Sequence, residues 1–170
     1  QNDGELGELL LYCFLETHLN APKILSKLEL KTTNKLYVNG ADGVHYLKLQ
    51  NGNYQIIFGE SKMYTDLDTA IENALESIKE FKEEVNNNGE KKSGIRFEKE
   101  LISDNLEKEF NKEDEDFLME LLYPKSSNDF EVDDAFGVFI GYEIKITDEE
   151  RKLSNSEFRI FHEISECCYE

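Results

Sequence analysis

Three short apolar runs separated by Asn- and Gly-rich connectors constrain the fold of this chain more than any other feature. The runs cover residues 35–38, 44–49 and 54–58, and the connectors cover 39–43 and 50–53. Short runs rich in β-branched and aromatic residues, bounded by Asn and Gly, are typical of strands joined by tight turns. The sequence therefore predicts a three-stranded antiparallel meander.

Helical periodicity appears on both sides of this predicted meander. Apolar residues at helical spacing predict a mostly buried first helix over 5–19, and a short second helix is expected over 22–30 because proline suits a first helical turn. After the strands, apolar residues alternate by steps of four and three: Leu67, Ile71, Ala74, Ile78, Phe81 and Val85. This spacing predicts a long amphipathic helix that begins near Asp66 and ends near Asn86.

The second half of the chain carries weaker local signals. We expect one helix around residues 117–122 closed by Pro124, a strand over 135–146, and a final helix after Thr147. Phe158, Phe161 and Ile164 are the candidate core contacts of that last helix. The order of helices and strands predicts a mixed α/β fold. A length of 170 residues predicts a single domain over residues 1–170.

Composition and the character of the first residues limit the cellular compartments in which the chain is expected. The chain has no apolar run near the ~20 residues of a membrane span and no secretory signal, so we expect a cytoplasmic location without a membrane partner. Its first residue is Gln1 rather than methionine, so an additional N-terminal segment is expected in the full-length protein. The cysteines (Cys13, Cys167 and Cys168) and the scattered histidines lack metal-ligand spacing, which predicts free thiols and no zinc site.

The net charge of −18 argues against nucleic-acid binding when it is taken as a whole. Its distribution changes that interpretation. Residues 1–62 carry six lysines and seven acids, a net of −1, so the remaining −17 lies after Lys62. A protein with this pattern can present a near-neutral face to DNA and an acidic face to a partner protein.

The candidate chemistry centres on Gly59-Glu60-Ser61-Lys62, directly after the apolar run 54–58. Alternation along a strand places Glu60 and Lys62 on one face and Ser61 on the other. Asp42 lies in the connector that begins the neighbouring strand. In an antiparallel hairpin, Asp42 and Glu60 are therefore expected to converge at one strand end.

These residue types suit metal-dependent phosphodiester hydrolysis. Mg²⁺ and Mn²⁺ prefer carboxylate, carbonyl and water ligands, so Asp42, Glu60 and the Ser61 backbone carbonyl are the candidate metal ligands. Lys62 is a candidate to orient or help deprotonate the attacking water and to offset developing charge. Glu8, on the first predicted helix, is the candidate fourth catalytic residue. Glu5 is its rival, and the helix dipole alone also favours an acid in a first turn.

This order of residues resembles the PD-(D/E)xK nuclease superfamily: a helix carrying Glu, then Asp, then E-x-K on adjacent strands, then a long helix. Ala41 stands where the superfamily has a proline before the aspartate. The segments GELGELLLYCFLE, GADGVHYL and IIFGESKMY resemble the HamA family, the nuclease subunit of the Hachiman anti-phage system. This resemblance covers residues 4–81. It implies a restriction-endonuclease-like α/β fold and Mg²⁺- or Mn²⁺-dependent DNA cleavage, restrained until a HamB helicase partner senses foreign or damaged DNA.

Other functions compete with this one. Glu and Lys also alternate commonly on solvated strand faces, where they have no catalytic role. The alternative function is therefore a catalytically inactive scaffold for protein interaction or DNA binding. A further alternative is a metal-dependent phosphoesterase acting on nucleotides or RNA. Lysines recur every four residues as a basic stripe toward DNA or as a solvated helix face: Lys23, Lys27, Lys31 and Lys35. His45 is expected to be a surface or packing residue of its strand. None of these patterns fixes an oligomeric state.

Overall fold

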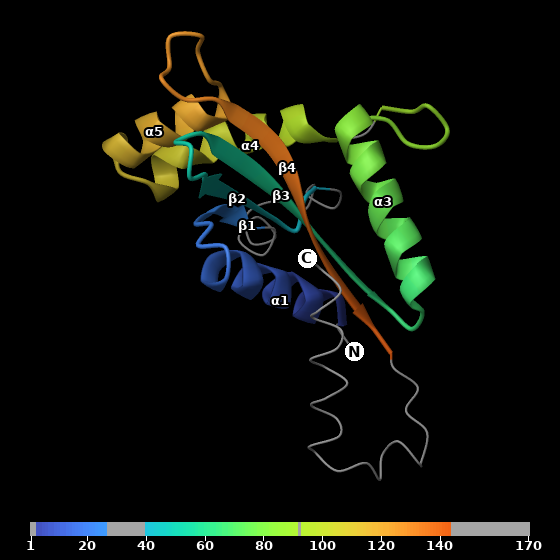
Figure 1. The fold of residues 1–170 in the computed structure, drawn as a ribbon. Helices are drawn as coiled ribbons and strands as arrows, with labels where there is room; N and C mark the ends of the chain where they lie inside the picture. Colours follow the sequence, from blue (N-terminus) through green and yellow to red (C-terminus); the bar gives the residue numbers. More distant parts are fainter. Residues whose placement is uncertain (1–2, 27–39, 92, 144–170) are drawn as a thin grey trace, which may run out of the picture.

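The computed structural model describes residues 3–26, 40–91 and 93–143 (Figure 1). Its elements follow the order α1 (Asp3–Thr17), β1 (Lys23–Ser26), β2 (Gly43–Lys48), β3 (Tyr54–Tyr64), α3 (Leu67–Glu83), α4 (Ile95–Glu109), α5 (Lys112–Leu122) and β4 (Val132–Tyr142). The strands form one mixed sheet in the order β1-β2-β3-β4. This arrangement confirms the predicted α/β class. The expected strand over 35–38 and the expected helix after Thr147 lie outside the described residues.

The predicted hairpin forms between β2 and β3. These strands are antiparallel, with a register that runs from Gly43 opposite Gly59 to Lys48 opposite Tyr54. The turn between them contains Gly52 at φ +91°, a left-handed conformation that glycine adopts without strain. The antiparallel pairing that the Asn- and Gly-rich connector predicted for these two strands is therefore confirmed.

The short helix expected over 22–30 is wrong where the structure describes it. Residues Lys23–Ser26 form β1, which pairs antiparallel with β2. Pairing with an existing strand edge outweighs the weak helical preference of a four-residue stretch, because isolated short helices gain little. Lys23 is consequently a strand residue, and its Nζ lies 5.7 Å from the centre of the Tyr12 ring. A helical lysine stripe cannot begin there.

The last strand pairs in parallel with β3. The register runs from Tyr54 opposite Val132 to Tyr64 opposite Tyr142, so β3 has a partner along its whole length on this side. The three helices between β3 and β4 make the crossover that a parallel pair requires. The E-x-K triplet therefore lies within β3, which extends beyond the strand end at Phe58 that the sequence suggested.

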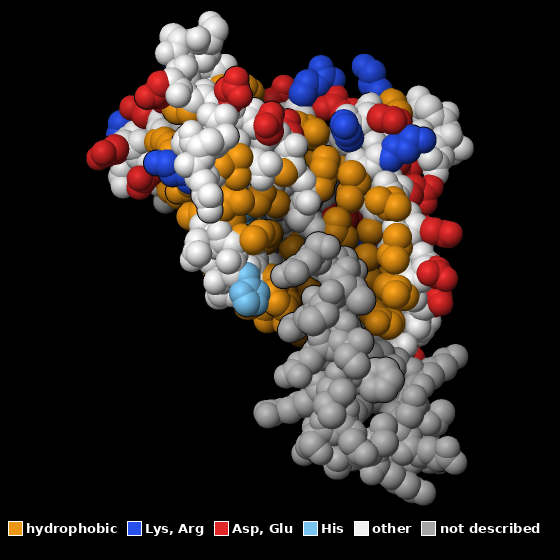
Figure 2. Space-filling model, in the orientation of Figure 1, with side chains coloured by type: hydrophobic (Ala, Val, Ile, Leu, Met, Phe, Trp, Pro, Cys, Tyr) orange, Lys and Arg blue, Asp and Glu red, His pale blue; other side chains and the backbone are white. Residues whose placement is uncertain are grey.

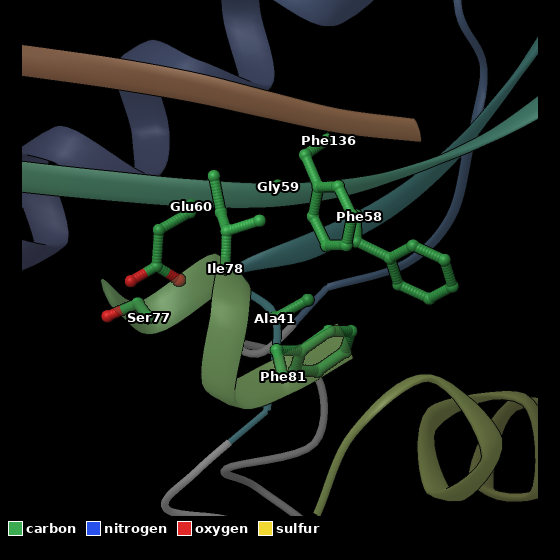
Figure 3. Close-up of a pocket in the computed structure, with 8 residues that line it drawn as sticks. All are labelled: Ala41, Phe58, Gly59, Glu60, Ser77, Ile78, Phe81 and Phe136. Atoms are coloured by element: carbon green, nitrogen blue, oxygen red, sulfur yellow. The ribbon is translucent and has the colours of Figure 1, made fainter. Parts of the chain in front are cut away.

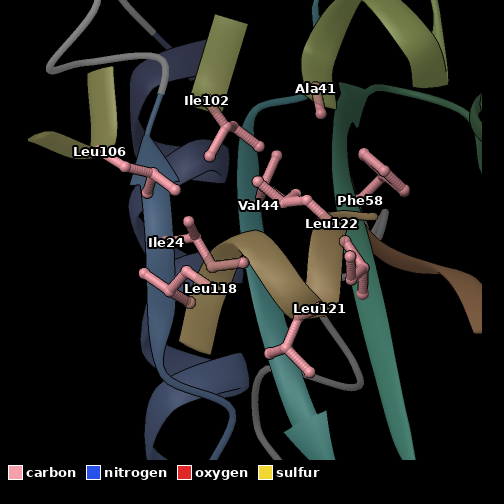
Figure 4. Close-up of a cluster of buried hydrophobic side chains, with 10 residues drawn as sticks. Ile24, Ala41, Val44, Phe58, Ile102, Leu106, Leu118, Leu121 and Leu122 are labelled. Carbon is pink, nitrogen blue, oxygen red and sulfur yellow. The ribbon is translucent and has the colours of Figure 1, made fainter. Parts of the chain in front are cut away.

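Helices cover both faces of the sheet. Helix α1 packs on one face, where Leu11 and Leu15 contact Ile57. Helices α3, α4 and α5 lie on the other (Figure 1). The larger core cluster there contains Ile24, Ala41, Val44, Ile56, Phe58, Ile102, Leu106, Leu118, Leu121 and Leu122 (Figure 4). Because both faces are buried, the strand run Ile56-Ile57-Phe58 is continuously apolar rather than alternating.

The long helix α3 confirms the sequence prediction. Asp66 caps its N-terminus by accepting a hydrogen bond from the Thr69 N–H at 2.9 Å. Its fully buried positions are Ala70 and Ala74, whereas Leu67, Ile71 and Leu75 remain 37–62% exposed. Figure 2 shows apolar side chains gathered along this helix. The predicted apolar stripe is therefore only partly buried in the described part of the chain.

Helix α4 was not predicted, although α5 was. Its core residues Ile95, Ile102 and Leu106 are separated by steps of seven and four. The position that completes the helical repeat between Ile95 and Ile102 is Glu98, which is 1% exposed. A charged residue at a core position interrupted the apolar pattern that sequence reasoning depends on. In the described part of the chain, no helix is both long and apolar enough to cross a membrane.

Candidate active site

The E-x-K triplet lies where β3 loses one of its two neighbours. Strand β2 pairs with β3 only as far as Gly59, while β4 continues to Tyr64. From Glu60 onward, the β2 side of β3 therefore has no backbone partner from β2. Among the described residues this edge of β3 is open, and Asp42 lies at it.

Asp42, which directly precedes β2, continues the ladder of hydrogen bonds between β2 and β3. Its backbone N–H donates to the Gly59 carbonyl oxygen at 2.8 Å. Its Oδ2 atom accepts two hydrogen bonds of 2.7 Å, one from the Ser61 N–H and one from the Ser61 hydroxyl. Asp42 was expected to converge with Glu60, and the residue of the triplet that it contacts is Ser61.

Glu60 and Lys62 share one face of β3, as strand alternation predicted. The Lys62 ammonium lies 2.5 Å from the Glu60 carboxylate, and both side chains are about one-fifth exposed (22% and 19%). Glu60 extends from β3 toward α3 beside a small pocket (Figure 3). The pocket is lined by Ala41, Phe58, Gly59, Glu60, Ser77, Ile78, Phe81 and Phe136. The ion pair thus lies between the sheet and α3.

Helix α1 approaches the opposite face of the triplet through Gly7. A Cβ atom at Gly7 would lie 3.3 Å from the Ser61 Oγ atom and 3.0 Å from the Met63 Cγ atom. This close approach places the next helical residue, Glu8, near the same segment of β3. Glu8 is half-buried and Glu5 is exposed, so Glu8 is the better placed of the two rival acids.

The four predicted residues do not form a closed cluster. Asp42 contacts Ser61, and Glu60 contacts Lys62. Among the described residues, no three His, Cys, Asp or Glu side chains gather closely enough to hold a metal ion. The structure therefore places Glu8 beside the triplet without bringing it together with Asp42 and Glu60.

The donor atoms at this edge have the chemistry that a hard cation prefers. Asp42 supplies a carboxylate at the edge itself, and Glu60 supplies a second one from the α3 face of β3. The N–H and carbonyl groups of one strand residue point toward the same neighbouring strand. Since the Ser61 N–H points toward Asp42, the Ser61 carbonyl faces this open edge as well. Two carboxylates and a backbone carbonyl suit Mg²⁺ or Mn²⁺. The residues present are thus compatible with the expected ion.

Sequence reasoning missed one residue that reaches this region, Glu98 on α4. Its Oε1 accepts a hydrogen bond from the Ala41 N–H at 2.7 Å, and both residues are buried. The two residues are 57 positions apart, so no local pattern links them. The available signal was an acid at a core position of a helical repeat.

His45 is a buried packing residue of β2. It is 1% exposed, and its Nδ1 lies 2.9 Å from the Ala21 carbonyl oxygen. Because a carbonyl only accepts, Nδ1 carries the proton and donates. Burial lowers the pKa of His45 against smaller upward effects of the Ala21 hydrogen bond and Glu16. The expected role in packing is confirmed.

Comparison with known proteins supplies one match. The family model described as HamA matches residues 1–169, essentially the whole chain. A search of curated proteins and a search of solved structures each gave no match. The family match extends the similarity well beyond residues 4–81, where the sequence motifs lie.

Proposed function

The chain belongs to the HamA family and thereby to Hachiman anti-phage defence, and we propose that it is a Mg²⁺- or Mn²⁺-dependent nuclease that hydrolyses DNA phosphodiester bonds. The observation that carries the proposal is the contact of Asp42 with Ser61 at the edge of β3, beside the Glu60–Lys62 pair. This edge offers oxygen ligands and a cation within one short segment of chain.

Each residue has a role that follows from its chemistry and place. Asp42, Glu60 and the Ser61 carbonyl would hold the divalent ion, which supplies charge stabilisation on the phosphate and makes water a better nucleophile. Lys62 orients the attacking water and offsets negative charge that develops on the phosphate. Glu8 would approach from α1, on the Ser61 face of β3, and hold a metal-bound water or a second ion.

The charge distribution supports a partner-dependent enzyme. The part of the chain that contains these residues, 1–62, has a net charge of −1, whereas the remainder carries −17. Nonspecific binding of DNA strengthens with the number of Lys and Arg side chains that contact phosphates. A near-neutral region can therefore receive DNA without strong nonspecific binding. We propose that a helicase subunit delivers the DNA and that the acidic part of the chain faces a protein rather than nucleic acid.

Plasmid cleavage with Mg²⁺, in the presence and absence of a helicase partner, tests the proposal. We expect Glu60→Gln and Lys62→Met each to lower the rate about a hundredfold or more, because each removes a charged group from the reaction centre. Glu72→Gln and Lys79→Met, on the exposed face of α3, are matched controls that should cleave normally. Unchanged cleavage by both site variants would overturn the assignment. An RNA substrate run in parallel separates a DNA nuclease from a phosphoesterase of other specificity.

A second candidate is a catalytically inactive scaffold with a nuclease fold. It is favoured by one observation: the described residues contain no cluster of three potential metal-ligating side chains. Titration of the chain with Mn²⁺ separates the candidates. A nuclease should bind Mn²⁺ and lose that binding in Asp42→Asn, whereas a scaffold should show no binding that depends on Asp42.

A further inference from the structure

A buried acid on α4 contacts the backbone next to Asp42. Glu98 is 1% exposed, and its Oε1 accepts the Ala41 N–H at 2.7 Å. A buried carboxylate is costly unless it makes hydrogen bonds, so an acid at this core position needs a specific role. Ala41 is also buried, at 6% exposure, and it directly precedes Asp42.

The segment Ala41–Asp42 is held at three consecutive points. Glu98 binds the N–H of Ala41, the Gly59 carbonyl binds the N–H of Asp42, and Ser61 binds the Asp42 carboxylate. The last two contacts come from β3. Only the first comes from another layer of the molecule. Glu98 therefore fixes the chain just before Asp42 relative to the helical layer.

Helix α4 is itself anchored on both sides of Glu98. Its N-cap, Gly94, packs so closely on the end of α3 that a Cβ atom there would collide with the Phe81 carbonyl oxygen. The next residue after Glu98, Lys99, forms an ion pair of 2.7 Å with Asp134 on β4. A carboxylate carried by a helix anchored in this way is a fixed acceptor for the Ala41 N–H.

We propose that Glu98 is a positioning residue for Asp42. It holds the Ala41 peptide so that the Asp42 side chain stays against Ser61 at the open edge of β3. Its position as an acceptor matters in this role, and its negative charge does not. The inference rests on the proposed function insofar as Asp42 is a metal ligand, while the positioning itself concerns the chain alone.

Two conservative variants separate position from charge. Glu98→Gln keeps an oxygen at the same distance and removes the charge, whereas Glu98→Asp keeps the charge on a shorter side chain. We expect amide hydrogen exchange at Asp42 and Ser61 to accelerate about tenfold in Glu98→Asp and to stay within about threefold of wild type in Glu98→Gln. Exchange at Ile56, which is buried near the start of β3, should change in neither variant.

Lys99→Met serves as the matched control for a merely structural effect. It loosens the same helix without touching Ala41, so it should lower thermal stability without selective acceleration at Asp42 and Ser61. The proposal is overturned if Glu98→Gln loosens these amides while Glu98→Asp does not. Equal behaviour of Glu98→Asp and Lys99→Met would overturn it as well.

Metal binding by the whole chain connects this role to the proposed function. Partners that orient a metal ligand typically contribute ten- to a hundredfold to metal affinity, so the Mn²⁺ dissociation constant should rise at least about tenfold in Glu98→Asp. If the wild-type chain neither binds Mn²⁺ nor cleaves DNA, the proposed function fails. The exchange at Asp42 and Ser61 still decides the role of Glu98 in that case.

Discussion

Asp42 accepts both hydrogen bonds that Ser61 can donate, from its N–H and from its hydroxyl, each at 2.7 Å. One carboxylate oxygen of Asp42 thus takes the place of a backbone acceptor, just before β2 begins at Gly43. This contact joins the start of β2 to the middle residue of the E-x-K triplet. It also fixes the edge toward which the Ser61 carbonyl points.

Ser61→Ala tests how much of this contact the hydroxyl supplies. The variant keeps the hydrogen bond from the Ser61 N–H and loses the one from Oγ, so we expect a loss of about 1 kcal/mol in the free energy of unfolding. DNA cleavage should fall less than tenfold, because the backbone carbonyl remains. Urea unfolding and plasmid cleavage measure the two effects, with Ser126→Ala in the exposed loop after α5 as the control. A loss of activity as large as that of Glu60→Gln would mean that the hydroxyl itself takes part in the chemistry.

Two glycines of α1 provide a comparison of packing. A Cβ atom at Gly4 meets nothing within 4 Å, whereas one at Gly7 would press on Ser61 and Met63. Alanine favours a helix over glycine by up to about 1 kcal/mol. We therefore expect Gly4→Ala to be neutral or slightly stabilising and Gly7→Ala to be less stable than Gly4→Ala by about 1 kcal/mol. Thermal unfolding of both variants checks this, and equal stability would show that α1 does not approach β3 closely at Gly7.

Stability should fall in mild acid because of His45. Burial lowers the pKa of this histidine in the folded state, so the unfolded chain binds more protons once the pH falls below about 6.5. Stability contributed by neutral His45 is full above that pH and decreases as the pH falls toward the folded-state pKa. We expect urea unfolding between pH 7.5 and 5.5 to show this decrease in wild type and in His18→Asn. His45→Asn should show a flatter profile, and an equally steep one would assign the effect to other groups.

The ion pair between Lys99 and Asp134 should contribute more than the surface pairs of Lys112. Lys99 is 16% exposed and joins α4 to β4, whereas Lys112 is 74% exposed and pairs with Glu115 and Asp116 in its own helix. We expect Lys99→Met to cost about 1–2 kcal/mol, whereas Lys112→Met should leave the free energy of unfolding nearly unchanged. Chemical denaturation compares the two. A larger effect of Lys112→Met would contradict the importance of burial.

The elements that the sequence predicted are those whose information is local. Strands β2 and β3 follow from apolar runs around an Asn- and Gly-rich turn, and α3 follows from its periodicity and the capping residue Asp66. The shared face of Glu60 and Lys62 follows from strand alternation alone. These features depend on residues a few positions apart, so they can be identified without any knowledge of the rest of the chain.

The features that the sequence did not predict depend on partners distant in the chain. Residues 23–26 form a strand because β2 offers them an edge, and α4 exists although Glu98 interrupts its apolar repeat. The amphipathic pattern of α3 did not indicate which of its apolar residues would be buried.

The sequence by itself determined the E-x-K triplet and the long helix that follows it. Only the tertiary structure decided that Asp42 binds Ser61, that Glu8, Asp42 and Glu60 do not gather into one cluster, and that Glu98 binds the peptide before Asp42. The physical reason is that local backbone preferences select helices and strands, whereas hydrogen bonds between buried groups form only after packing brings distant segments together.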